Sequence, residues 1–297
     1  MSSRNLAFLA AIGATVIYGL NHTIAKGVMP QYVKPFGFIL LRVSGAAILF
    51  WVISIAGPRQ AIEKRDWLRL LLCAFLGMVV NMLAFFKGLQ LSTPVNSSVL
   101  VTLTPIIVAV FSFFLIREHL TRIRSLGILL GFLGALSLIF LNKTTGMNAP
   151  NIPLGNFLFL VNATSYGLYL ILVKKLIEKY HPFVLMRWLF TVAFLINLPI
   201  TLPEYLEIEW SGIPAWGLAS IAFVVIGTTF LTYLFNVFAL TQLKASTVSA
   251  FIYGQPVIGI AFALMAGKDT LSLLEVLAML LVMGGVYLVS RRSIPGP

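Results

Sequence analysis

Charged residues are scarce in this chain. Only 10% of its 297 residues are Asp, Glu, Lys or Arg, whereas 59% are hydrophobic. A soluble globule needs many more polar side chains to cover its surface, since roughly a quarter of the residues in such proteins are charged. The composition therefore excludes an ordinary soluble protein and indicates that most of the surface contacts lipid.

Residues for catalysis and metal binding are equally few. Cys73 is the single cysteine, which excludes an intrachain disulfide and a cysteine metal cluster. The histidines His22, His119 and His181 are far apart in the sequence, and the chain has no HExxH motif, carboxylate pair or nucleophile with an adjacent base. We therefore expect no enzyme activity, no metal and no cofactor.

Long apolar runs are what the chain has instead. A helix needs roughly 20 apolar residues to cross the hydrocarbon core, and a barrel strand needs about half as many with alternating polarity. The runs have the length of helices, and the connections between them are too short to form a soluble domain. We predict an all-α integral membrane protein with ten transmembrane helices, at 6–26, 36–56, 68–88, 94–116, 123–141, 155–174, 183–203, 214–238, 245–266 and 272–290.

The second half of the chain repeats the first. Pro105 matches Pro256 at an offset of 151 residues, and Tyr18 matches Tyr166 at an offset of 148. Because five is odd, a five-helix unit repeated in tandem inserts its second copy upside down, which is how many alternating-access transporters are built. We predict one membrane domain made of two inverted five-helix repeats, residues 1–142 and 143–297.

The basic residues are distributed unevenly between the loops. The net charge is +12, and placing the N-terminus in the cytoplasm puts 14 of the 21 Lys and Arg residues inside and five outside. This bias is typical of a membrane protein and argues against a nucleic-acid partner. We predict a multi-pass protein of the cell inner (plasma) membrane with cytoplasmic N- and C-termini. Its expected partners are the lipid bilayer and a small-molecule substrate, and it is expected to be a monomer or homodimer.

These features resemble the drug/metabolite transporter superfamily, specifically its ten-helix EamA type. The residues that carry the resemblance are the run Tyr18 to Asn21, the pair Leu41-Arg42, the stretch from Gly88 to Pro105, and Arg117 to Thr121 followed by three glycines. The second half follows the pattern more loosely, with Asp269 in place of the usual glutamate. The resemblance implies that the first four helices of each repeat line a central cavity and that the fifth lies to one side.

Polar and aromatic residues on the lining helices are the candidates for the substrate cavity. Amide and hydroxyl groups among aromatic rings suit a neutral or zwitterionic organic solute with an apolar part. They do not suit a bare multivalent anion, which would need paired Lys or Arg. The candidates are Tyr18, Asn21, Asn81, Asn96, Ser97, Thr102, Asn162, Tyr166, Tyr169, Trp188, Tyr233, Asn236, Ser249, Tyr253 and Gln255.

Two arginines and two prolines inside the spans are candidates for gating. Inverted symmetry places Arg42 and Arg187 near opposite mouths, where each either anchors a gate, attracts an anionic group such as a substrate carboxylate, or extends to headgroups and helix-end carbonyls. Pro105 and Pro256 each remove a backbone donor near the middle of matching helices, so each is either a hinge or a fixed bend.

Acidic residues are absent from the middle of every predicted span. The small multidrug exporters related to this superfamily need a membrane-buried carboxylate to exchange protons for organic cations, so the resemblance disfavours proton-coupled cation antiport here. His22 is the one group within the spans that titrates near neutral pH, and it is either a proton site or a structural residue.

Together the features predict an alternating-access permease that moves small organic metabolites such as amino acids. Export is the expected direction, and no coupling ion is expected. A proton-coupled drug/metabolite antiporter and a lipid flippase or scramblase are the alternatives.

Overall fold

The helical elements account for nearly all of the described chain. The structure is a computed structural model, and it describes residues 3–55, 57–116, 121–140, 149–243, 251, 254–269 and 271–290. Among these residues there is no strand. Eight helical segments are long and apolar enough to cross a membrane, and two further apolar helices, Gly254–Met265 and Leu273–Val289, are shorter. The prediction of an all-α fold is confirmed.

The helices fall into two sets along the chain. The first set is α1 (Ser3–Val28), α2 (Pro35–Ser54), the continuous run α3 (Trp67–Ala74), η2 (Phe75–Val80) and α4 (Asn81–Leu91), then α5 (Pro94–Val101), α6 (Thr104–Ile116) and α7 (Arg122–Phe140). The second set is α8 (Ile152–Ile177), α9 (Pro182–Leu206), the run α10 (Ala215–Ala222), η4 (Phe223–Leu231) and α11 (Thr232–Gln242), then α13 (Gly254–Met265) and α14 (Leu273–Ser290). Proline at the start of α2, α5, α8 and α9 fits these beginnings, because the first helical turn needs no backbone donor there.

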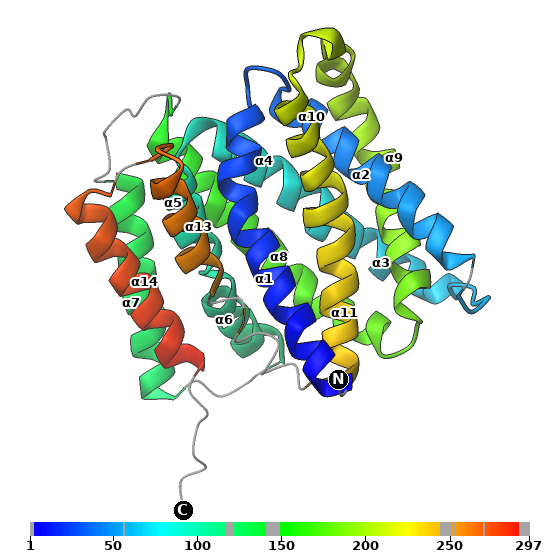
Figure 1. Ribbon diagram of the computed structural model, residues 1–297. Helices are drawn as coiled ribbons and strands as arrows, with labels where there is room; N and C mark the ends of the chain where they lie inside the picture. Colours follow the sequence, from blue (N-terminus) through cyan, green and yellow to red (C-terminus); the bar gives the residue numbers. More distant parts are fainter. Residues whose placement is uncertain are drawn as a thin grey trace, which may run out of the picture.

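Equivalent helices of the two sets make equivalent contacts. α2 packs along α9, while α1 packs against α11 and α13 much as α8 packs against α4 and α6. α7 and α14 lie side by side at one edge of the molecule (Figure 1). This arrangement leaves α1 and α8 in the middle of the bundle, where each can contribute residues to a shared site.

The α7–α14 pair is held by very close backbone approach. A Cβ added at Gly127 would lie 2.6 Å from the carbonyl oxygen of Gly285, and one at Gly134 would lie 2.8 Å from that of Ala278. Small residues allow such approach between membrane helices. The glycine spacing in α7 thus forms a packing seam within the chain.

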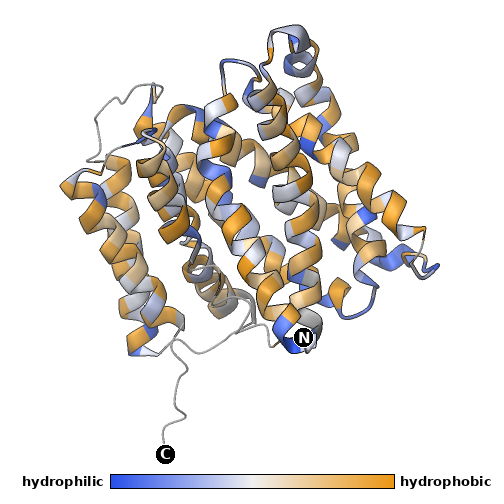
Figure 2. Ribbon diagram, viewed as in Figure 1, coloured by the Kyte–Doolittle hydropathy of each residue, from blue (hydrophilic) through white to orange (hydrophobic). Residues whose placement is uncertain are grey.

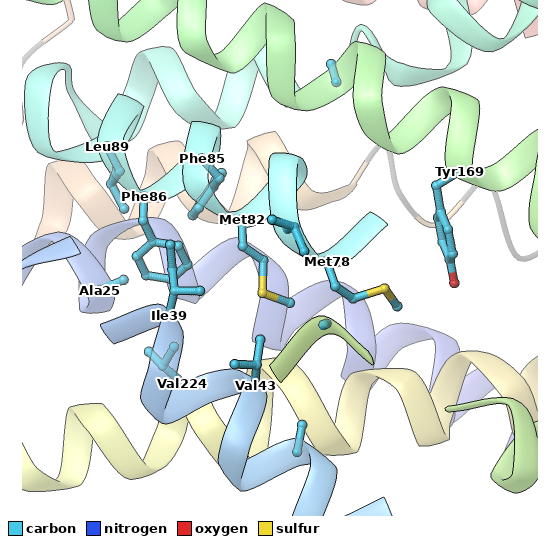
Figure 3. Packing of buried hydrophobic residues seen from close by; sticks show 14 of the residues in the cluster. Ala25, Ile39, Val43, Met78, Met82, Phe85, Phe86, Leu89, Tyr169 and Val224 are labelled. Atoms are coloured by element: carbon cyan, nitrogen blue, oxygen red, sulfur yellow. The ribbon is translucent and has the colours of Figure 1, made fainter. Parts of the chain in front are cut away.

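Apolar side chains occupy both the interior of the bundle and the outward-facing surfaces of its helices. Figure 2 shows hydrophilic residues gathered mainly near the ends of the helices, with hydrophobic residues along their lengths. Large apolar residues such as Ile48, Leu129 and Leu195 are exposed, as a lipid-facing surface requires. In the interior, Met82 and Phe86 of α4 point toward α2 (Figure 3).

Two spans contain a stretch of π-helix at matching places. η2 interrupts the third span and η4 interrupts the eighth, and neither stretch contains proline. In η4 the hydroxyl of Thr229 donates to the carbonyl oxygen of Val224, five residues earlier, at 2.9 Å. Single π-turns inside α-helices are frequent at functional sites because the wider turn redirects the side chains that follow.

Candidate functional site

Four tyrosines converge inside the bundle. Tyr18 comes from α1, Tyr166 and Tyr169 come from α8, and Tyr233 comes from α11. Their phenol groups are close enough that a charge on any one would act on each of the other three. Tyr169 is buried, whereas the other three are partly exposed within their spans. Residues from both halves of the chain therefore build one polar and aromatic centre.

The rings at this centre are held by close packing. The rings of Tyr166 and Tyr169 have their centroids 5.5 Å apart, and the ring of Tyr233 meets that of Phe190 edge-on at 5.3 Å. Tyr169 extends away from α8 into the interior (Figure 3), where Gly77 of η2 leaves room for its ring. A Cβ added at Gly77 would lie 2.6 Å from that ring, so the glycine sets the position of Tyr169.

Arg42 of α2 reaches the same centre. Its Nε donates to the hydroxyl of Thr229 at 2.8 Å, and its guanidinium lies 5.0 Å from the centroid of the Phe86 ring. It also interacts electrostatically with Tyr233 and Tyr18, and only 7% of the residue is exposed. No carboxylate pairs with it in the described part of the chain.

A second group of predicted residues lies where α1 meets α5. The Nδ1 of His22 lies 2.8 Å from the hydroxyl of Ser97, which itself donates to the carbonyl oxygen of Pro94 at 2.9 Å. Ser97 therefore joins the ring of His22 to the first turn of α5. The ring of His22 also meets Phe85 edge-on at 5.5 Å. These contacts describe a buried, hydrogen-bonded histidine.

Two buried amides accompany this histidine. Asn21 and Asn96 are 4% and 0% exposed, and the side-chain oxygen of each has no hydrogen-bond partner among the described residues. The amide nitrogen of Asn96 donates to the hydroxyl of Ser92 at 3.4 Å. An unpaired buried acceptor carries a desolvation penalty, so these oxygens are suited to a ligand or water.

Other predicted cavity residues are used to join helices. The Nδ2 of Asn162 donates to the carbonyl oxygen of Asn81 at 2.9 Å, and that of Asn81 donates to the carbonyl oxygen of Asn162 at 3.4 Å. Thr102 is buried and donates to the carbonyl oxygen of Val99 at 2.6 Å. Asn236 on α11 and Gln255 on α13 are partly exposed. Ser249 and Tyr253 lie outside the described residues.

Arg187 and Trp188 form a separate cluster. The ring of Trp188 meets those of Trp51 and Trp67 edge-on, at 5.5 and 5.1 Å. The terminal nitrogens of Arg187 donate to the hydroxyl of Ser54 at 3.3 Å and to the carbonyl oxygen of Gln60 at 3.4 Å. Arg187 thus ties α9 to the end of α2 and to the loop that follows it.

The two predicted bends lie in the matching helices α6 and α13. Pro105 is the second residue of α6, and the chain turns out of α-helix between Val101 and Thr104, where α5 ends and α6 begins. Pro256 is buried within α13. The fourth span is therefore a pair of short helices that meet inside the bundle.

Comparison with known proteins agrees with this architecture. The model of the EamA-like transporter family matches residues 5–140 and again residues 153–291. The chain belongs to the EamA-like transporter family. That family has a ten-helix membrane fold, so the prediction of ten transmembrane helices is confirmed, and the protein is a multi-pass membrane transporter.

Relatives of this EamA-like transporter share its length. The uncharacterized transporter YetK of Bacillus subtilis (strain 168) is 22% identical over 95% of this chain and 86% of its own. An uncharacterized transporter of Archaeoglobus fulgidus is 27% identical over 93% of this chain and 95% of its own. A solved crystal structure superimposes with a TM-score of 0.63 at 18% identity, covering 95% of each chain, which supports the fold.

Three residues of this EamA-like transporter that were not among the predicted site residues make contacts between helices. Lys26 donates to the carbonyl oxygens of Leu89, Gln90 and Ser92, at 2.5, 2.8 and 2.9 Å, and so binds the end of α1 to the end of α4. Asp269 accepts from the backbone nitrogen of Val95 at 3.0 Å at the start of α5. Thr229 orients Arg42. In the sequence, Lys26 was marked by its repeat counterpart Lys174, at an offset of 148 residues, and Asp269 by its place in the family pattern.

Proposed function

We propose that this protein exports small organic metabolites such as amino acids by alternating access, without a coupling ion. The observation that carries the proposal is the centre formed by Tyr18, Tyr166, Tyr169 and Tyr233, to which both halves of the chain contribute. Hydroxyl groups beside aromatic rings suit an organic solute with polar and apolar parts. A site shared by two inverted repeats is also where rocking of one repeat against the other would expose a solute to each side in turn.

The two ends of the bundle differ in a way that supports alternation. At the end that holds Lys26, α1 is bound to α4 by three hydrogen bonds. At the opposite end the repeat counterpart Lys174 is exposed and forms no hydrogen bond or ion pair with the described residues. We interpret this difference as one state of a two-state cycle in which residues 1–142 and 143–297 act as inverted repeats. The Lys26 end faces outward in the predicted topology, with both termini in the cytoplasm at the inner (plasma) membrane.

The positions of the acidic residues support transport without a coupling ion. In the described chain the carboxylates lie at helix ends or in loops, and Glu275, the most buried, accepts from the backbone nitrogen and hydroxyl of Ser272 at the start of α14. His22 is engaged by Ser97 and Phe85. Neither feature offers an acidic side chain that protons could load at the centre.

The test is solute movement through liposomes that contain the purified protein. A panel of amino acids and related metabolites is loaded on one side, with and without a pH gradient, and equilibration is followed over time. We expect protein-dependent equilibration of some panel members and no accumulation against a concentration gradient. Accumulation driven by the pH gradient would instead establish proton coupling, and movement of labelled lipids alone would establish a flippase or scramblase.

A further inference from the structure

We infer that Arg42 is the docking site for a carboxylate on the transported solute, with the hydroxyls of Tyr18 and Tyr233 beside it. This inference rests on the proposed transport function and names the chemical class of its substrate: organic monocarboxylates, zwitterionic amino acids included. The positive charge of Arg42 has no neutralising partner in the described chain.

A buried cation inside a membrane span is costly and needs compensation. Arg42 is 7% exposed, and its described partners are the neutral hydroxyl of Thr229 and the face of the Phe86 ring. Both stabilise a guanidinium only partly, because neither carries a negative charge. An anion that arrives with the solute would supply the missing charge.

The hydrogen bond to Thr229 uses only one of the three nitrogens of the Arg42 guanidinium. Nε is taken by Thr229, and the two terminal nitrogens form no hydrogen bond with any described residue. These terminal N–H groups are the ones that bind a carboxylate in a bidentate manner. The hydroxyl of Tyr18 lies beside that of Thr232, and Tyr18 and Tyr233 both interact with Arg42. The π-helix η4 places Thr229 so that it orients the group.

The repeat counterpart provides an internal contrast. Arg187 uses both terminal nitrogens, on Ser54 and on the carbonyl oxygen of Gln60, and its guanidinium lies 4.8 Å from the centroid of the Trp51 ring. Its terminal nitrogens are therefore committed to the protein. Of the two arginines that the sequence placed symmetrically, Arg42 is the one whose terminal nitrogens have no hydrogen-bond partner among the described residues.

The surroundings also indicate what the rest of the solute is. Tyr166 and Tyr169, with centroids 5.5 Å apart, form an aromatic wall at the same centre. The one lysine of α1, Lys26, lies in the last turn of that helix and is bound to three carbonyl oxygens. A single carboxylate attached to an apolar or aromatic group matches these features better than a multivalent anion does.

The first experiment compares different ligands on the wild-type protein in lipid nanodiscs. Binding of 3-phenylpropionate, 3-methylbutanoate, L-phenylalanine and L-leucine is measured by calorimetry beside the amide of each, and chloride and phosphate serve as simple anions. We expect at least one carboxylate to bind at least tenfold more tightly than its amide. Equal binding of every acid and its amide, or tighter binding of chloride or phosphate than of any carboxylate, would overturn the inference.

The second experiment removes the anchor. In Arg42→Gln the preference for acid over amide is expected to fall to about one, with an intermediate value in Arg42→Lys and in Thr229→Val. Lys175→Gln, which removes an exposed positive charge from α8, is the matched control and keeps the wild-type ratio. Each variant is first checked for a single monodisperse species. If Arg42→Gln does not give one, the ratios of Arg42→Lys and Thr229→Val decide, and wild-type ratios in both would contradict the inference.

These readouts separate the inference from the function on which it rests. Carboxylate binding that depends on Arg42, together with no solute movement in liposomes, would refute transport and leave the anion site standing. Solute movement together with acid-to-amide ratios that Arg42→Gln leaves unchanged would refute the anion site and leave transport standing.

Discussion

The α7–α14 seam and the two ends of the central bundle differ in symmetry: the two repeats make equivalent contacts in the seam and different contacts at the ends. In the seam, Gly127 faces the backbone of Gly285 and Gly134 faces that of Ala278, so equivalent residues make equivalent contacts. At the ends, Lys26 binds three carbonyl oxygens while its counterpart Lys174 is exposed. A contact that both repeats make can persist when the two repeats exchange conformations. A contact that only one repeat makes is expected in only one of the two states. On the proposed mechanism, the seam is a fixed scaffold and the ends of the bundle move.

The largest effect is expected where the scaffold is tightest. In Gly285→Leu a side chain enters a space in which even a Cβ would lie 2.5 Å from the carbonyl oxygen of Gly127. We expect the thermal midpoint in detergent to fall by about 5 °C or more, because overpacking a helix contact costs roughly 1–3 kcal/mol or more. Gly284→Leu is the control, since a Cβ there meets nothing within 4 Å. Equal midpoints for the two variants would contradict the close seam.

Lys26→Gln tests the asymmetric end. Loss of charged hydrogen bonds, each contributing roughly 1.5–3 kcal/mol, is expected to favour opening of this end by about tenfold or more. The measurement is the labelling rate of Val95→Cys, a residue that is fully buried at the start of α5, in a Cys73→Ala background. Opening of this end exposes the cysteine at position 95 and so raises its labelling rate.

The matched control for this change is another lysine at the same end. Lys87→Gln removes a side chain that bonds only to the side-chain oxygen of Gln90, at 2.8 Å, among the described residues. Its labelling rate is expected to stay at the wild-type value. Identical rates in Lys26→Gln and Lys87→Gln would show that Lys26 does not close this end.

A smaller effect is expected at the centre, where the repeats meet. Gly77→Ala forces the ring of Tyr169 to move, because the added Cβ would lie 2.6 Å from it. We expect the affinity for carboxylates with an aromatic group to fall about three- to tenfold, in line with roughly 1 kcal/mol of repacking. Carboxylates with a short aliphatic group are expected to lose less. Gly27→Ala, with nothing within 4 Å, is the control, and equal affinities in both variants would remove Tyr169 from the site.

The smallest effect concerns a loop contact outside the spans. The Lys179 ammonium, 2.6 Å from Glu63, holds the pKa of that carboxyl below its usual value. A lowered pKa means that the contact stabilises the fold above the unfolded pKa, and that this stability is lost as pH falls through the folded pKa. We expect the thermal midpoint of the wild type to approach that of Glu63→Gln between about pH 6 and about pH 3. A constant gap across this range would contradict the contact.

The positions of the helices could be predicted because a backbone in lipid must satisfy its own hydrogen bonds. An apolar run of sufficient length has to form a helix, and the predicted span 36–56 is found as Pro35–Ser54. The prolines of α2, α5, α8 and α9 fit the helix starts as well. The aromatic centre was also within reach, since Tyr18 and Tyr166 match each other in the repeat and polar residues inside spans are few.

The asymmetry of the molecule could not be predicted from a symmetric sequence. A repeat gives Arg42 and Arg187, or Lys26 and Lys174, the same expected role, whereas in the structure the two members of each pair make different contacts. The π-helices were also missed, because the apolar run through Phe75–Val80 has the same hydrophobicity in either helix type. The hydrogen bond from Arg42 to Thr229 joins residues 187 positions apart, and no local pattern contains that information.

Alternating access is the central claim, and cross-linking each end in turn tests it most directly. Gly27→Cys with Leu91→Cys joins α1 to α4, and the repeat equivalents Lys175→Cys with Gln242→Cys join α8 to α11, all in a Cys73→Ala background. With a solute identified in liposomes, we predict that a bifunctional maleimide at either pair stops its movement, and that each single-cysteine protein keeps wild-type rates after the same treatment. Continued movement with either pair fully cross-linked would contradict the account.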